Sequence, residues 1–433
     1  MRGRDFLLGS TLLLGTALPV LAQREPPKAP RFEVDPLWPK PMPSRWILGS
    51  TVGVAVDARD NVFVVNLTDS FTPRTEIGLA TNPPTGECCA PAANVLEYDP
   101  AGALVGHWGG PGQGYDWPEM NSGLAIDDSG NVWIGGGGGG DSRILKLSHD
   151  GKFIAQFGKA GAAVAAAPSG RGADTAYAGV SPGRGGRGAA GGRGGRGGRA
   201  STPALPANSQ SMDSFGGPAG FSFDAKENEA YVADGHRNHR VAVIDMTTGV
   251  VKRFWGAYGN KPDDSDTAKY DPASTPRKQF GAPVRCAQLS KDGLVYVCDT
   301  RNDRIQVFKK DGSFVKERAI APKTLGMGSV WDIAFSRDPL QKYLYVADGM
   351  NMRVYIVDRQ TLDVLTSFGD GGRQPGQFYA VHSLATDSKG NLYTAETYEG
   401  KRVQKFNFKG IGVVPAANQG VLWPTRAAGG AKR

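Results

Sequence analysis

Histidine and cysteine are scarce in this chain. Among its 433 residues there are only five histidines and four cysteines. No C-x-x-C pair occurs, and no histidine follows a cysteine at the spacing of a zinc finger, so the sequence gives little support for that class of protein. Each of the five histidines is therefore weighed separately as a candidate for metal binding or acid–base chemistry.

The chain also lacks a hydrophobic run that is long enough to be a convincing membrane span. Its one extended apolar run, residues 6–20, follows Arg2 and Arg4 and ends at a Val-Leu-Ala cleavage site. This arrangement is typical of a secretory signal peptide over residues 1–22. No cysteine follows the cleavage point, which disfavours a lipid anchor, and a glycine separates the two arginines, which disfavours a twin-arginine signal. We expect a periplasmic or secreted protein without a stable membrane span after cleavage, a retained anchor being the alternative.

Net charge is small outside one segment. The formal net charge is +8, but residues 159–211 hold seven basic residues against one acid and so account for +6 of it. This segment is rich in Gly, Ala and Arg, with "GRGGRGAAGGRGGRGGR" at its centre, and has almost no apolar residues to bury. We predict a disordered insertion there. The rest of the chain is nearly neutral, so no nucleic-acid partner is expected.

The four cysteines suit an oxidising compartment, where disulfides are stable. Cys286 and Cys298 are equidistant from Asp292, the centre of a Lys-Asp-Gly turn, and would lie opposite each other in a hairpin. They can form a cross-strand disulfide or remain as two buried thiols. Cys88 and Cys89 can bond to each other or to other partners, and the sequence leaves their pairing open.

Internal repeats account for most of the chain. The clearest copies are "GLVYVCDTRNDRIQVFKKDGSFVKE" (293–317) and "KYLYVADGMNMRVYIVDRQTLDVLTSFG" (342–369). The other four cover 60–67 with 94–109, 130–158, 228–256 and 390–410. One more short apolar strand precedes each copy, which makes four strands per unit, joined by tight Asp-Gly and Gly-Asn turns. Six such units predict an all-β fold, a six-bladed β-propeller. A β-sandwich would not explain six similar copies.

The ends of the chain suggest how the ring closes. The propeller should span residues 47–412, preceded by a Pro-rich extension (23–46) and followed by a tail (413–433). The last unit has only the weak strand "IGVVP" (411–415) at its outer edge. We therefore expect "RFEVD" (31–35) to supply an outer strand to the last blade. We expect the protein to be a monomer.

The inner strands give a set of residues at one mouth of the channel. Aligning the six units places there Val52, Ser122, Ala219, Arg285, Trp331 and His382. His236, in the loop "ADGHRNHR" (233–240) between the second and third strands of its blade, should lie on the same face. His107 falls on an outer strand, and His149 in a turn on the opposite face, where we expect it to be solvated. His239 should flank the next strand.

The repeats resemble the NHL-type propellers, and within them the peptidyl-α-hydroxyglycine α-amidating lyases. The resemblance covers roughly residues 47–410. It rests on the loop pattern Asp-x-x-Asn-x-Arg at Asp299 and Asp348, on the longer loop that begins at Asp234, and on "HSLATD" (382–387). The lyase family binds zinc through three histidines at the heads of alternate inner strands, which correspond here to Ser122, Arg285 and His382. A guanidinium offers no lone pair, so only His382 can be a metal ligand.

Two functions follow from this pattern. In the first, the channel mouth binds a small molecule, a peptide or a protein, and an anionic or aromatic group would suit it. The ligand-binding residues would be Ser122, Arg285, Trp331, His382 and His236. In the alternative, the protein is a lyase-like enzyme with a rebuilt site. His236, at the position of the family's catalytic tyrosine, and His382 would then be the catalytic acid–base groups, with zinc or calcium as cofactor.

A lactonase of the related six-bladed type is disfavoured, because its channel needs acidic metal ligands and the predicted mouth has none. The aspartates at the far ends of the inner strands, such as Asp57, Asp127 and Asp387, are expected to cap turns instead.

Overall fold

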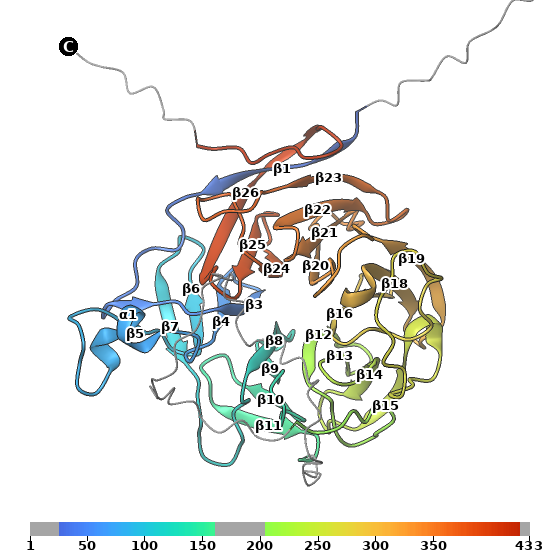
Figure 1. Ribbon diagram of the computed structural model, residues 1–433, viewed down its shortest axis with the longest axis horizontal. Coiled ribbons are helices and arrows are strands. Elements are labelled where there is room, and N and C mark those ends of the chain that lie inside the picture. The colour runs from blue at the N-terminus through green and yellow to red at the C-terminus, as the bar shows by residue number, and fades with distance from the viewer. Residues whose placement is uncertain (1–25, 161–203, 425–433) are drawn as a thin grey trace, which may run out of the picture.

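Six sheets of four antiparallel strands surround a central channel in the computed structural model of this protein (Figure 1). The structure describes residues 26–160 and 204–424. The predicted all-β, six-bladed β-propeller is therefore confirmed. The expected signal peptide (1–22), most of the insertion and the end of the tail lie outside the described residues. Among the residues described, no helix has the length and apolar character needed to cross a membrane.

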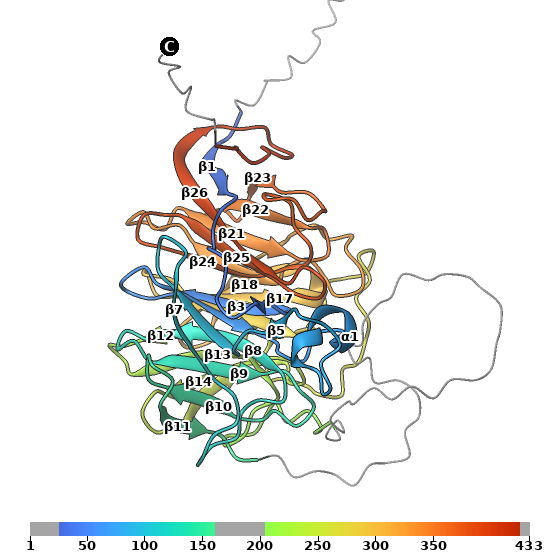
Figure 2. The same cartoon turned by 90° about the vertical axis from the view of Figure 1, so that its left-hand side faces the viewer.

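Each blade runs from an inner strand at the channel to an outer strand at the rim (Figures 1 and 2). Blade 1 comprises β3 (Thr51–Val56), β4 (Val62–Asn66), β6 (Val95–Tyr98) and β7 (Leu104–Trp108). Blade 2 comprises β8 (Asn121–Ile126), β9 (Val132–Gly136), β10 (Ile144–Leu147) and β11 (Phe153–Phe157). Blade 3 comprises β12 (Pro218–Asp224), β13 (Glu229–Asp234), β14 (Arg240–Asp245) and β15 (Val251–Trp255).

The other three blades follow the same order. Blade 4 comprises β16 (Val284–Leu289), β17 (Leu294–Asp299), β18 (Arg304–Lys309) and β19 (Phe314–Ala319). Blade 5 comprises β20 (Asp332–Phe335), β21 (Tyr343–Asp348), β22 (Arg353–Asp358) and β23 (Val364–Phe368). Blade 6 comprises β24 (Val381–Thr386), β25 (Leu392–Glu396), β26 (Arg402–Val413) and, at its outer edge, β1 (Lys28–Asp35).

The second strands of the blades are almost entirely buried, as in β13 ("EAYVAD") and β21 ("YLYVAD"). Their near-continuous apolar sequences fit this position, since both faces of each sheet are covered by neighbouring blades. The core therefore lies between blades. Trp133 of β9, for example, contacts Phe221 and Phe223 of β12.

Strand β1 closes the ring by joining the two ends of the chain in one sheet. It pairs antiparallel with β26, with Phe32 opposite Phe408 and Val34 opposite Phe406. The expected closing strand is confirmed, and Figure 2 shows it beside β26. The separate outer strand expected at 411–415 does not form. Instead β26 continues without a break to Val413, because Lys28–Pro30 pairs with its far end.

Short elements occupy the loops. They are β2 (Trp46–Ile47), α1 (Pro73–Glu76), η1 (Gly78–Ala80), β5 (Ala90–Pro91), η2 (Ala257–Gly259) and η3 (Thr300–Asn302).

Both pairs of cysteines form disulfides. Cys286 and Cys298 join β16 to β17 with a Cα–Cα distance of 4.9 Å, which confirms the cross-strand alternative. Cys88 bonds to its neighbour Cys89.

The described end of the predicted insertion, residues 204–211, is part of the folded protein, which corrects the expected boundary. Leu205 and Ser209 are buried. The Ser209 hydroxyl accepts a hydrogen bond from the backbone N–H of His239 at 2.9 Å, and the Arg240 side chain donates to the carbonyls of Ser209 and Ser211. Sequence composition missed this because the contacts are made by polar backbone and hydroxyl groups.

Candidate binding site at the channel mouth

A cavity of about 330 Å³ occupies the central channel. The six residues that the strand alignment placed at the mouth all line it: Val52, Ser122, Ala219, Arg285, Trp331 and His382. Each comes from a different blade, just before or near the start of the inner strand. The other end of the cavity is lined by residues that include Asp128, Lys291 and Arg337.

Arg285 is the central charged group of the mouth. It lies on β16, and only 5% of its surface is exposed. Its guanidinium carbon is 4.6 Å from the centre of the Trp331 ring, a cation–π contact. Nη1 is 2.5 Å from Nε2 of His382 and donates to it. Nε and Nη2 have no hydrogen-bond partner among the described residues. A buried cation with unsatisfied N–H donors therefore borders the cavity.

Trp331 forms a rigid wall beside this cation. Its indole N–H donates to the carbonyl of Gly328 at 2.7 Å, and its ring meets the His382 imidazole edge to face at 5.7 Å. Trp331 is buried, and the ring is fixed by these contacts together with Tyr398. An aromatic surface and a guanidinium are thus held side by side.

His382 lines the cavity, whereas His236 contacts the lining residue Ser122 and is not itself part of the lining; both are neutral at neutral pH. Burial, the charge of Arg285 and then that of Arg237 lower the pKa of His236 to about 3. Burial, the charge of Arg285 and the proximity of His236 also hold the pKa of His382 well below its usual range. Arg285 is therefore the positive charge of the mouth, and the imidazoles act as uncharged hydrogen-bonding groups.

The loop Ala233–Arg240 positions His236 against blade 2. Nε2 of His236 and the hydroxyl of Ser122 share a hydrogen bond of 2.6 Å. The approach is close, because a Cβ atom on Gly137 would lie 2.7 Å from that same nitrogen. Arg237 ties the loop to blade 2 by donating to the carbonyl of Gly138 at 2.7 Å.

The remaining polar residues of this loop belong to the repeat architecture, as the sequence predicted. Asp234 accepts hydrogen bonds from Asn238 Nδ2 at 2.7 Å and from Arg240 Nε at 2.8 Å. Asp299 makes the same pair of contacts in blade 4. His239 turns away from His236, and its Nδ1 lies 2.7 Å from the carbonyl of Phe280. The two histidines therefore have different partners and do not form a His-x-x-His metal motif.

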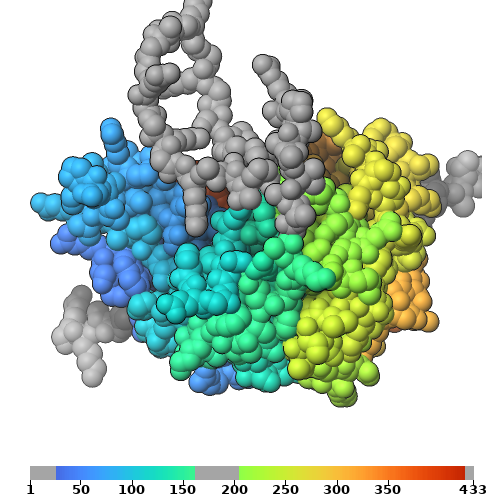
Figure 3. Space-filling view, turned by 90° about the horizontal axis from the view of Figure 1, so that it is seen from below, coloured from blue at the N-terminus to red at the C-terminus, as the bar shows by residue number. Residues whose placement is uncertain are grey.

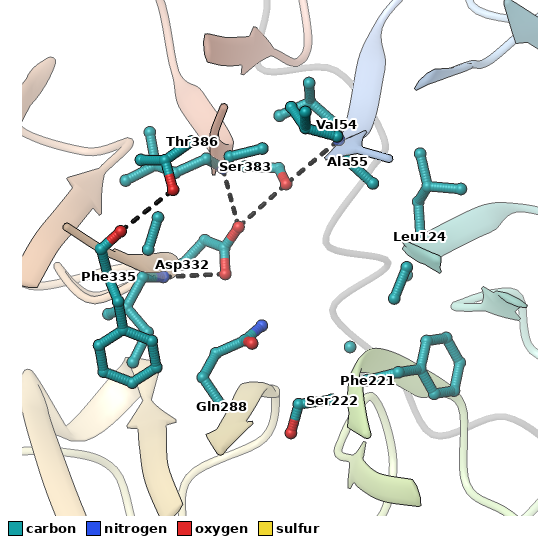
Figure 4. Close-up of a pocket in the computed structure, with 18 of the residues that line it drawn as sticks. Val54, Ala55, Leu124, Phe221, Ser222, Gln288, Asp332, Phe335, Ser383 and Thr386 are labelled. Carbon is teal, nitrogen blue, oxygen red and sulfur yellow. Dashed lines mark hydrogen bonds between the residues drawn. The ribbon is translucent and has the colours of Figure 1, made fainter. Parts of the chain in front are cut away.

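Asp332 is a site residue that the sequence analysis missed, and it corrects the expectation of a mouth without acids. Its carboxylate accepts hydrogen bonds from Ser383 Oγ at 2.9 Å, Leu384 N at 2.9 Å and Ile333 N at 2.8 Å (Figure 4). Burial raises its pKa to about 6, against the hydrogen bonds and the charge of Arg285. The alignment counted one residue per inner strand, but an inner strand is the edge of a radial sheet, so neighbouring side chains on both faces can border the channel.

The positions that correspond to the zinc ligands of the amidating lyases do meet at the mouth, but they do not fit zinc. Of Ser122, Arg285 and His382, only His382 has a nitrogen lone pair, and it faces the Arg285 guanidinium. The Ser122 hydroxyl is engaged with His236. A metal ion here would meet a fixed positive charge instead of a third donor.

Comparisons with known proteins find solved structures of similar fold but no matching sequence family. No family model and no curated protein matches the chain. A streptogramin B lyase structure is 11% identical and covers 88% of this chain and 98% of its own, with a TM-score of 0.43. A structural genomics protein of unknown function from Bacteroides thetaiotaomicron is 12% identical over 84% of this chain and 70% of its own, with a TM-score of 0.44. Virginiamycin B lyase from Staphylococcus aureus is 11% identical over 91% of this chain and 94% of its own, with a TM-score of 0.41.

Proposed function

We propose that this protein is a binding scaffold whose channel mouth takes a small ligand with an oxyanion, such as a carboxylate or sulfonate, next to a flat apolar ring. The observation that carries the proposal is Arg285, a buried guanidinium that borders the cavity with two nitrogens that lack hydrogen-bond partners among the described residues. A buried guanidinium with two unsatisfied nitrogens is unfavourable, and a bound anion would supply the missing acceptors.

The surroundings of Arg285 favour such a ligand. The neutral imidazoles of His236 and His382 add no charge of their own, so the attraction comes from Arg285 alone. Trp331 lines the same cavity and packs against the Arg285 guanidinium, so it adds apolar surface beside the charge. A volume of about 330 Å³ is at the lower end of the range for small-molecule sites.

Binding is favoured over catalysis by the protonation state of the histidines. A general base works best when its pKa is near the ambient pH, whereas burial and Arg285 lower the pKa of His236 to about 3. His382 is shifted in the same direction. The lyase-like alternative would need His236 or His382 to carry a proton beside a fixed guanidinium, and it is the weaker hypothesis.

We further propose that the protein acts outside the cytoplasm as a monomer. The signal-like sequence of residues 1–22 and the two disulfides support export. A small molecule or a peptide group of matching charge would then reach the mouth from the surrounding medium.

The test is calorimetric titration at pH 5, where Asp332 is largely protonated, of the purified protein with benzenesulfonate, a permanent anion on a flat ring, and with the neutral benzenesulfonamide. We expect saturable binding of the anion only, and its loss in Arg285→Met, which keeps the length of the side chain without the charge. Lys291→Met, at the other end of the cavity, is the matched control and should bind as the wild type does. Equal binding of the anion by Arg285→Met and wild type would reject the proposal.

A further inference from the structure

The face of the ring opposite the mouth carries a cluster of three metal-ligating side chains between blades 1 and 2. Asp57 follows β3 and Glu97 lies on β6, both in blade 1, whereas His149 comes from the turn between β10 and β11 of blade 2. Blades 1 (blue) and 2 (green) adjoin along the flank seen in Figure 3. The sequence predicts a solvated His149, but this residue lies half-buried between two buried carboxylates.

The donor atoms have the spacing of ligands around one ion. Nε2 of His149 is 3.2 Å from Glu97 Oε1 and 3.4 Å from Asp57 Oδ2, and all three atoms lie within 4.8 Å of one another. In a tetrahedral zinc site with metal–ligand bonds of about 2.0 Å, neighbouring ligand atoms are about 3.3 Å apart. The three atoms are therefore placed to share a zinc-sized ion with little movement.

Neighbouring groups hold the three side chains in these positions. Oδ1 of Asp57 accepts hydrogen bonds from the backbone N–H groups of Arg59 and Asn61, both at 2.8 Å, which leaves Oδ2 directed at the cluster. Asn61 Nδ2 donates to Glu97 Oε1 at 2.7 Å, and the Phe63 ring meets the His149 imidazole edge to face at 5.0 Å. Such outer contacts orient the ligands of metal sites.

A cation already lies against these atoms. Nη2 of Arg59 is 2.5 Å from His149 Nε2, and Nε of Arg59 is 3.4 Å from Asp57 Oδ2. One imidazole nitrogen cannot accept a hydrogen bond from a guanidinium and at the same time donate one to the carboxylates that face it. The contacts of Nε2 thus cannot all be favourable. The Arg59 side chain is 66% exposed, so it can move away and leave the position to another cation.

Within residues 26–160 and 204–424, such a cluster occurs only at this junction of two blades. In blade 2, Asp127 has the position of Asp57, and the position of Glu97 is taken by Lys146, whose Nζ lies 3.5 Å from Asp127. In blade 6, Asp387 is satisfied by Asn391 and the Tyr393 hydroxyl. Turn capping therefore explains the aspartate but not the added Glu97 and His149.

We propose that Asp57, Glu97 and His149 bind a divalent transition-metal ion such as zinc. The bound ion replaces the Arg59 guanidinium and joins blades 1 and 2. The imidazole nitrogen favours zinc over calcium and magnesium, which prefer all-oxygen sites. Three protein ligands leave one position for water. The site is separate from the channel mouth and does not depend on the function proposed there.

The test is calorimetric titration of the chelator-treated full chain with zinc chloride, with calcium chloride as a second probe. We expect one equivalent of zinc that His149→Gln weakens by at least about a hundredfold, since even outer contacts of metal sites are worth tenfold to a hundredfold. Calcium should bind far more weakly. His107→Gln, on the outer strand β7, and His382→Gln, at the mouth, are controls that should keep this equivalent.

Arg59→Ala gives a second, independent result. The interaction of the exposed Arg59 guanidinium with the cluster is worth up to about 1 kcal/mol. Removal of this competing cation should therefore tighten zinc binding by about fivefold. If the cluster has only a structural role, neither the wild type nor any variant should bind zinc. The absence of saturable zinc binding in both the wild type and Arg59→Ala would overturn the proposal, and so would His149→Gln binding zinc as tightly as the wild type.

Discussion

Ring closure by β1 should contribute a large part of the stability of the propeller, and Phe32→Ala tests this. Phe32 is 2% exposed, and its ring contacts Tyr345 and Phe368 at 5.4 Å and Phe408 at 6.2 Å between ring centres. Truncation of a buried phenylalanine removes its apolar burial and leaves a cavity, which together are worth about 3–5 kcal/mol. We expect a loss of that size in the free energy of unfolding.

The assay is equilibrium unfolding in urea at pH 7. Glu33→Ala, the next residue on the same strand, is the matched control. Its carboxylate makes an ion pair with Lys409 at 3.4 Å near the surface, so its removal should change stability by less than about 1 kcal/mol. If Phe32→Ala is as stable as Glu33→Ala, β1 does not hold the ring closed. Since His382 and Val52 come from the two blades that meet at the closure, the same variant should also weaken ligand binding at the mouth.

Two further predictions concern stability. Replacing Cys286 and Cys298 together by alanine should lower the free energy of unfolding by about 2–4 kcal/mol in the absence of reductant. Urea titrations with and without dithiothreitol measure this loss. An unchanged unfolding midpoint in the double variant would contradict the prediction. Asp332 should contribute a loss of about 3 kcal/mol to the free energy of unfolding as the pH rises from about 4 to about 6, because burial raises its pKa from the ordinary value of 3.8 to about 6 and the folded state thus favours the protonated acid. Asp332→Asn should flatten this pH dependence, and an unchanged slope would refute the assignment.

The sequence predicts the blades because each blade repeats the same local pattern. The closing strand and the opposition of Cys286 and Cys298 follow from it, since both depend on strand pairing within one sheet, whereas the sequence left open whether these cysteines bond. The mouth residues also follow, because six aligned inner strands must begin at the same end of the channel. Arg285, Trp331 and His382 lie together for this reason.

What the sequence could not reveal depends on packing between blades. His149 meets Asp57 and Glu97 only because a turn of blade 2 lies against a turn of blade 1. Asp332 borders the channel because both faces of an edge strand can be exposed there. The pairing of Cys88 with Cys89 is likewise set by a loop whose path has no repeat to define it.

The most direct test of the proposed binding site is the free energy of unfolding of wild type and Arg285→Met, each with and without benzenesulfonate. Measurement at pH 5 keeps Asp332, whose pKa is about 6, largely protonated, so that it does not balance the Arg285 charge. We predict that Arg285→Met without ligand is no less stable than the wild type, because a buried cation lacking an anionic partner is replaced by an apolar chain. The ligand should stabilise the wild type alone. A variant that is markedly less stable without ligand, and that the anion stabilises as much as it does the wild type, would contradict the account.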